Sequence, residues 1–284
     1  MFKLIVNADD FGLHSMVNDG IIKGHTKGII TSTSLLASGS AFDEAVSMAQ
    51  QYPKLGIGVH IALVGGIPPV SDPSEVPSLV TKDGVFVDNY IEFMKRIYSG
   101  HINYSEVSKE IEAQIQKIVD TGLRITHIDG HQHMHILPTI LPIVIEKSLA
   151  HHIKAMRVPN EKINFLNGVH NPVRILGKTG LSAVASQAMP IARRNGIRFN
   201  QYFWGMINGG QLTETALIGI LKKVSNYGGV HEIMTHPGSN NLELNHTYNW
   251  NYHWEEELSG LISDHVRRYI TQHDIELVNY GDLL

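Results

Sequence analysis

The sequence of 284 residues contains no cysteine. Disulfide bonds, thiolate zinc sites and cysteine nucleophiles are therefore excluded, and a bound metal ion would have to be held by histidine and carboxylate side chains. No block of Lys and Arg stands out and the formal net charge is −4, so the chain lacks the basic surface that nucleic-acid binding requires. We expect no nucleic-acid partner.

Long hydrophobic runs are missing as well. The first apolar run, residues 2–6, is followed at once by Asn7 and two aspartates, and it is too short for a signal-peptide core or a membrane span. We therefore expect a cytoplasmic protein with no membrane partner. The composition, with 43% hydrophobic and 18% charged residues, is that of an ordinary globular protein.

Short β-type segments alternate with longer amphipathic segments along most of the chain, which is typical of parallel strands covered by helices. We predict an α/β fold, a (β/α) barrel that is incomplete or distorted, in one domain over residues 1–284. The predicted strands are 3–7, 29–36, 56–61, 124–129, 155–158, 230–235 and 275–278. The predicted helices are 16–27, 42–51, 105–121, 139–150, 213–226 and 255–272. Two stretches, 65–89 and 160–210, interrupt the alternation, and we predict that both are loops that shape a substrate cleft.

Two adjacent carboxylates, Asp9 and Asp10, follow the first predicted strand, where a parallel strand delivers residues to the functional face of a barrel. Neighbouring like charges are tolerated when a cation neutralises one of them, or when one is partly protonated and acts as a general base. A solvated Asx turn, closed by Phe11 and Gly12, would explain the same residues. The pair indicates either a metal-binding and catalytic motif or such a turn.

Histidine is abundant, with 17 residues, and four of them lie in the segment that runs from the end of a predicted strand to the start of a predicted helix: His127, His131, His133 and His135. Neutral imidazole is the commonest protein metal ligand, and a catalytic metal usually takes three protein ligands. Some of the four must therefore support a ligand or face the substrate. Asp129 shares a strand face with His127 and can orient a ligand imidazole. A surface tract of histidines is the alternative, and it fits the interleaved apolar residues poorly.

Three further residues end other predicted strands. His60 taken alone is weak evidence for a metal site, because a histidine at a strand end is more often a hydrogen-bonded polar residue than a metal ligand. His236, before a Pro-Gly turn, could be a fourth ligand, a general acid or a turn cap. Arg157 could hold a carboxylate in its ionised form, contact substrate or lie on the surface. Because all these candidates end separate strands, where barrel enzymes place catalytic groups, the sequence predicts an enzyme.

These segments resemble the YdjC-like carbohydrate deacetylase family, whose best-known members remove acetyl groups from chitooligosaccharides. The resemblance is carried by residues 7–12, 31–34, 58–60, 126–135 and 234–238. It implies a barrel-like fold related to polysaccharide deacetylases and one divalent cation, Mg or Zn. Transferred to this sequence, it implies that Asp10, His60 and His131 are the metal ligands. It also implies that Asp9 is the base and His236 the acid.

The resemblance implies hydrolysis of the N-acetyl groups of an amino sugar or short oligosaccharide. The cation would polarise the amide and a water molecule, Asp9 would take a proton, and His236 would protonate the departing amine. Arg157, Asp129, His133 and His135 are candidates for substrate binding or for support of the ligands. Residues 160–210 match the chitooligosaccharide enzymes poorly, which leaves the substrate open.

Aromatic residues in and after that poorly matched stretch could stack on sugar rings or pack in the core: Tyr202, Phe203, Trp204, Tyr248, Trp250, Tyr252 and Trp254. Two rival functions stay open. One is a metal-dependent hydrolase of a phosphoester or a cyclic amide, and the other is a sugar-binding protein without catalysis on a hydrolase-like scaffold. The expected partner is a small carbohydrate, and a homodimer is also open.

Overall fold

The computed structural model describes residues 2–283. Within them, parallel strands form one 9-stranded sheet in the order β6-β5-β4-β3-β2-β1-β8-β7, with β9 paired to β1. The strands are β1 (Phe2–Phe11), β2 (Ser32–Leu35), β3 (Gly56–Ile61), β4 (Ile125–Gly130), β5 (Ala155–Met156), β6 (Arg198–Phe199), β7 (Tyr202–Trp204), β8 (Gly229–Thr235) and β9 (Ile275–Leu277). No ladder joins β6 to β7 among these residues. The sheet is thus a curled, incomplete barrel, which confirms the predicted fold class.

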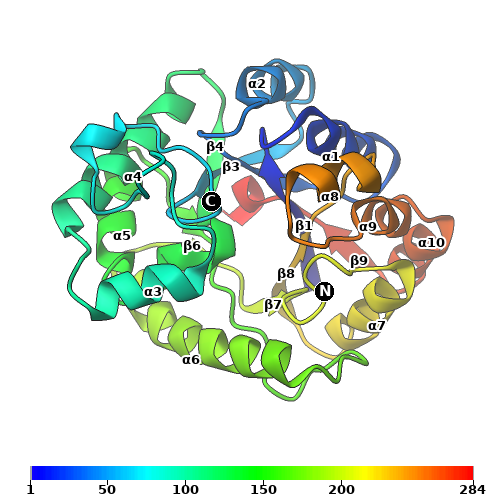
Figure 1. Ribbon diagram of the computed structural model, residues 1–284. Coiled ribbons are helices and arrows are strands. Elements are labelled where there is room, and N and C mark those ends of the chain that lie inside the picture. The colour runs from blue at the N-terminus through cyan, green and yellow to red at the C-terminus, as the bar shows by residue number, and fades with distance from the viewer. Residues whose placement is uncertain (1, 284) are drawn as a thin grey trace.

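Helices surround this sheet on its outer side, and Figure 1 views the barrel nearly along its axis. They are α1 (Ser15–Lys27), α2 (Phe42–Gln51), α3 (Tyr90–Tyr98), α4 (Tyr104–Val119), α5 (Leu141–Ala150), α6 (Pro172–Arg194), α7 (Glu214–Val224), α8 (Asn241–Thr247), α9 (Trp254–Leu261) and α10 (Asp264–Gln272). Short 3-10 helices are η1 (Pro73–Glu75), η2 (His131–Ile136) and η3 (Tyr280–Leu283). None of the helices in residues 2–283 is both long and apolar enough to cross a membrane.

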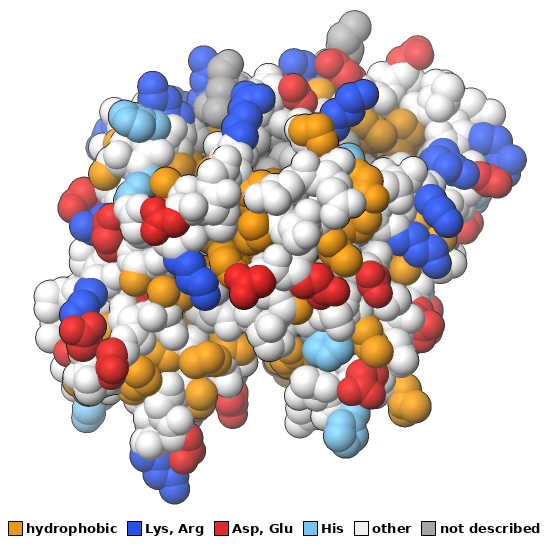
Figure 2. Space-filling view, turned by 90° about the horizontal axis from the view of Figure 1, so that it is seen from above, with side chains coloured by type: hydrophobic (Ala, Val, Ile, Leu, Met, Phe, Trp, Pro, Cys, Tyr) orange, Lys and Arg blue, Asp and Glu red, His pale blue; other side chains and the backbone are white. Residues whose placement is uncertain are grey.

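The central strands are buried on both faces, as is usual for parallel strands covered by helices. Every residue of β2 and β3 is buried, and one large hydrophobic cluster joins the strands to the helices that cover them. The seven predicted strands all occur, with ends that differ by a few residues. On the face drawn in Figure 2, acidic and basic side chains are interspersed, and the molecular surface is hollowed at its lower edge.

The prediction of loops over residues 160–210 was wrong. The stretch contains α6, a helix of 23 residues, and the two short strands β6 and β7. Gly177, Gly180 and Pro190 lie inside α6. Because such residues usually interrupt helices, the sequence pattern did not indicate a helix here. Asn171 nevertheless caps its first turn, and a row of buried alanines packs the helix against the barrel.

The predicted helix over residues 255–272 is two helices, α9 and α10. The side chain of Ser263 accepts hydrogen bonds from the backbone N–H groups of His265 and Val266, so it begins a new helix in the middle of the amphipathic pattern. Besides α6, two helices were not predicted, α3 and α8; both are short, with 9 and 7 residues. The break lets α9 and α10 follow the curve of the barrel separately.

Helix α1 packs closely against the turn that follows β8. A Cβ atom added at Gly20 would lie 2.6 Å from the Cα of Gly238. We expect Gly20→Ala to lower the free energy of unfolding by about 1–2 kcal/mol, because the clash outweighs the gain in helix propensity. Thermal unfolding would measure it, with Asp19→Ala, an exposed neighbour on the same helix, as control. Equal stability of Gly20→Ala and the wild type would contradict this close packing.

Candidate active site

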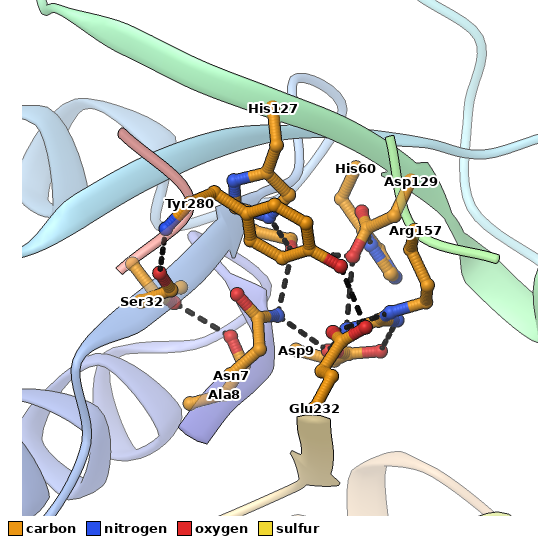
Figure 3. Close-up of polar contacts among 12 residues, drawn as sticks. Asn7, Ala8, Asp9, Ser32, His60, His127, Asp129, Arg157, Glu232 and Tyr280 are labelled. Carbon is orange, nitrogen blue, oxygen red and sulfur yellow. Dashed lines mark hydrogen bonds and ion pairs between the residues drawn. The ribbon is translucent and has the colours of Figure 1, made fainter. Parts of the chain in front are cut away.

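The polar candidates from the sequence meet at the carboxyl ends of the strands. Asp9 and Asp10 come from the end of β1, His60 from β3, Asp129 from β4, and Arg157 and His236 directly follow β5 and β8. Each of these side chains is at most 6% exposed. Figure 3 shows His60, Asp129, Arg157, Glu232 and Asp9 pointing toward one another from these separate elements.

Asp10, His60 and His131 form a compact group of potential metal ligands, with one ligand atom from each lying within 4.8 Å of the others. The Asp10 Oδ1 atom is 3.0 Å from His131 Nδ1 and 3.4 Å from His60 Nε2. The other carboxylate oxygen, Oδ2, is buried without a hydrogen-bond partner. One carboxylate, two imidazoles and a free buried oxygen suit a divalent cation without sulfur ligands.

The backbone at Asp10 aims its carboxylate into this group. Its φ angle is +66°, in the left-handed region that few residues other than glycine adopt, and such strain often occurs at functional sites. Burial alone would raise the pKa of Asp10, but the imidazoles of His131 and His60 hold it well below its usual range. Asp10 is therefore ionised, as a metal ligand must be.

Asp129 orients His60 and does not itself face the ligand group. Its Oδ1 lies 2.7 Å from His60 Nδ1, and its Oδ2 accepts a hydrogen bond of 2.6 Å from the hydroxyl of Ser34. This leaves His60 Nε2 directed at Asp10. Burial would raise the pKa of Asp129, but the charge of Arg157 keeps it well below its usual value. Asp129 thus lies where a carboxylate that orients a ligand imidazole is expected.

Arg157 is fully buried and holds Asp9 with both ends of its guanidinium group. Nη1 and Nη2 each donate a hydrogen bond of 2.6 Å to one oxygen of Asp9. The same Nη2 is 3.0 Å from Asp129, and Nε donates to Glu232 at 2.8 Å. The alternative of a surface arginine is therefore wrong. A paired fork of this kind fixes the plane of a carboxylate.

A second group of potential ligands, Asp9, His60 and Asp129, overlaps the first. Arg157 already lies against both of its carboxylates, at 2.6 and 3.0 Å. The guanidinium group therefore supplies the positive charge that a cation would bring there. The Asp10 group is the better metal site.

Glu232 and Tyr280 belong to the hydrogen-bond network around Arg157, and neither was predicted from the sequence as a site residue. The Tyr280 hydroxyl donates a hydrogen bond of 2.6 Å to Glu232, and burial, opposed by Arg157, raises the pKa of Glu232 to about 7. Glu232 lies four residues before His236, which directly follows β8, so strand alternation directs both side chains to one side, and this even spacing was the available signal.

His127 is fully buried and belongs to neither ligand group. Its ring stacks on Tyr280, with centroids 4.0 Å apart, and burial lowers its pKa to about 4. It is therefore a neutral packing and hydrogen-bonding residue.

His236 lines the same cavity as Asp9 and belongs to neither group of potential ligands. Its Nδ1 has no hydrogen-bond partner, and its ring centroid is 4.9 Å from that of Tyr252. The backbone N–H of His236 donates a hydrogen bond of 2.6 Å to Glu257, a buried carboxylate that sequence reasoning also missed. This placement favours a general acid over a fourth metal ligand.

His133 and His135 follow the ligand His131 and point to different places. His135 Nε2 lies 3.0 Å from the backbone oxygen of Arg157, so this ring contacts the backbone of the arginine. His133 lines the cavity, and its Nδ1 has no partner. Burial lowers the pKa of both rings, that of His135 to about 4. His133 is thus the one of this pair that a substrate can reach.

A cavity of about 620 Å³ opens beside these residues. Its walls include Asp9, His60, His131 and His236 together with Trp250 and Tyr252. Of the aromatic residues considered for sugar stacking, Phe203, Trp204 and Trp254 are instead buried in the core. Trp250 and Tyr252 are therefore the ones placed to contact a bound ligand, and the Trp250 ring lies 5.1 Å from that of His131.

Comparison with known proteins finds relatives that match nearly the whole chain. The family model for YdjC-like proteins matches residues 3–272. The chain is 31% identical to a carbohydrate deacetylase of Brevibacillus brevis, with 99% of each chain covered. It is 26% identical to a carbohydrate deacetylase of Mus musculus, covering 99% of this chain and 94% of that one.

A solved structure is also similar. A protein of Enterococcus faecalis described as a candidate cellobiose-phosphate cleavage protein superposes with a TM-score of 0.80 at 26% identity, covering 99% of this chain and 98% of that one. The family match extends over nearly the whole chain, and it includes every residue of the site described above except Tyr280. This protein belongs to the YdjC-like family.

Proposed function

We propose that the protein is a metal-dependent hydrolase that removes N-acetyl groups from an acetylated amino sugar or a short oligosaccharide. One observation carries the proposal: Asp9, held by Arg157, and His236 face the same cavity beside the Asp10, His60 and His131 group. That is the arrangement of a base, an acid and a cation site around one substrate. The relatives named carbohydrate deacetylases point to the same reaction.

Asp9 acts as the general base. A divalent cation held by Asp10, His60 and His131 would supply Lewis-acid activation of the amide carbonyl and of a water molecule. Asp9 takes a proton from the attacking water, and Arg157 keeps the carboxylate in one orientation while it does so. His236 donates a proton to the departing amine, because an amide nitrogen leaves poorly without one. Two imidazoles among the ligands favour zinc or another transition metal over magnesium.

The cavity offers little for holding a phosphate group, which argues against a phosphoester as substrate. Arg174 Nη1 donates to the backbone oxygens of Ile207 and Gly209, and Lys178 Nζ donates to the oxygens of residues 162, 163 and 165. These are the Lys and Arg residues that line the cavity. Phosphoester hydrolases usually direct free cationic groups at their substrate. Phosphorylated disaccharides still belong in the assay, because the Enterococcus protein is described in those terms.

The test is acetate release from diacetylchitobiose and a panel of N-acetylated sugars by the metal-loaded protein. We expect acetate, its loss after treatment with a chelator, and its return when the metal is added back. Metal removal should also lower thermal stability, by about 4 kcal/mol where the metal was present at a thousand times its Kd. His131→Ala should behave like the metal-free protein, and His246→Ala, an exposed histidine outside the site, like the wild type.

Two results would contradict the proposal. Phosphate release with about two metals per chain would favour a phosphoesterase. A tightly bound metal and bound sugar without any product would favour the sugar-binding alternative.

A further inference from the structure

Beyond the catalytic residues, the cavity continues between α3 and α6, and its walls there are apolar. Met94 comes from α3, Met134 and Leu137 from η2 and the residue after it, and Leu181 and Val184 from α6. Figure 1 shows α3 and α6 side by side, and a Cβ added at Gly177 would lie 3.7 Å from the Tyr90 hydroxyl across the gap. We call this part of the cavity the α3–α6 groove.

Three of the polar side chains that line the α3–α6 groove, Gln132, Arg174 and Lys178, are already bound to the protein backbone. Gln132 accepts from the N–H of Tyr90 and donates to the oxygen of Asp88. The charged ends of Arg174 and Lys178 donate to backbone oxygens, as described above, so their aliphatic stems form the wall. Sugar hydroxyl groups placed here would lose hydrogen bonds to water and gain few in return.

The mouth of the α3–α6 groove exposes large apolar side chains. Leu176 is 74% exposed and Tyr90 is 43% exposed. Gly180 leaves open space beside them, since a Cβ added there would meet no atom within 4 Å. Apolar walls, exposed apolar rims and empty room between them are what an aliphatic ligand needs. The groove is one cavity with Asp9 and His236, so this ligand must be part of the molecule that reacts there.

We propose that the substrate is an N-acylated amino sugar bearing an aliphatic chain and that the α3–α6 groove binds this chain. The inference rests on the proposed hydrolysis of a sugar amide. The chain belongs either to the acyl group or to a substituent on the sugar, and the two sources share the chemistry that the groove recognises. Each buried methylene raises affinity roughly fourfold, so three of them give roughly 60-fold.

Calorimetric titration of the metal-loaded protein with products, which cannot turn over, tests this. Octyl glucosaminide against methyl glucosaminide probes a chain on the sugar, and octanoate against acetate probes a chain on the acyl group. We expect at least a tenfold lower Kd for the octyl ligand of one pair. Gly180→Leu should fill the groove and abolish that preference, while Ser186→Leu, on the same helix but not lining the cavity, should keep it.

Gly180→Leu should not lose thermal stability, because leucine is a better helix former and the space is open. Val184→Thr is a second variant of similar volume and should reduce the octyl preference several-fold. Equal affinity for long and short ligands in both pairs, or an octyl preference that survives Gly180→Leu, would overturn the inference. Acetate release from short sugars by the wild type is measured separately. If the wild type released no acetate, the proposed function would be contradicted. If only the octyl preference were absent, the proposed binding of an aliphatic chain alone would be contradicted.

Discussion

Asp9→Asn is expected to reduce kcat for acetate release by about 10³-fold, within the range typical of a lost general base. The amide cannot accept the proton of the attacking water. Asn is close to Asp in shape and can still accept one of the two hydrogen bonds that Arg157 donates, so the cavity should keep its form. Steady-state kinetics of the metal-loaded variant would measure the effect.

The control for this variant is its metal content. Asp9 is outside the Asp10, His60 and His131 group, so Asp9→Asn should bind the same amount of metal as the wild type. Asp10→Asn should instead lose metal and activity together. Full activity of Asp9→Asn, with normal metal content, would show that Asp9 is not the general base and would favour a base on another strand or helix.

Arg157→Met is expected to destabilise the protein by about 3–5 kcal/mol, the usual cost of leaving buried charges without their partner. Arg157 is the cation shared by Asp9, Asp129 and Glu232, and its side chain is completely buried. At roughly 2–3 °C per kcal/mol for a chain of this size, the melting temperature should fall by about 10 °C. Thermal unfolding of metal-loaded protein would measure it.

Two further variants separate the charge of Arg157 from its geometry. Arg157→Lys keeps the charge but not the planar fork, so it should recover part of the stability and little of the activity. Glu232→Gln added to Arg157→Met removes one of the unpaired carboxylates and should also recover stability. If Arg157→Met were as stable as the wild type, the three carboxylates would have to be neutralised by protonation instead.

Much of this site could be predicted from the sequence because its residues end separate strands. Asp9, Asp10, His60 and His236 lie at or just after the ends of short apolar segments, and parallel strands bring such ends to one edge. The strand pattern was recognisable because β-branched and apolar residues fill these buried segments. The family resemblance named the same ligand set, Asp10, His60 and His131, that the structure brings together.

The supporting residues could not be predicted in the same way. Tyr280 and Glu257 carry no local signal of function, and the even spacing of Glu232 from His236 is a weak one. Each of the three acquires its contact from a different segment of the chain. Arg157 was ambiguous for the same reason, since a buried and an exposed arginine look alike in sequence. The helix α6 was missed because packing of its alanines against the barrel overrides the helix-breaking tendency of its glycines and Pro190.

The sequence by itself thus determined the parallel α/β fold, the exclusion of sulfur ligands and the set of carboxylates and imidazoles available for chemistry. These follow from local composition and periodicity, which a chain carries before it folds. Only the tertiary structure decided that Arg157 binds Asp9, that His236 stands apart from the ligand group, and that α3 and α6 enclose an apolar groove. Such relations depend on distances between segments that lie far apart in the chain, and those distances exist only once the curled sheet and its helices have packed together.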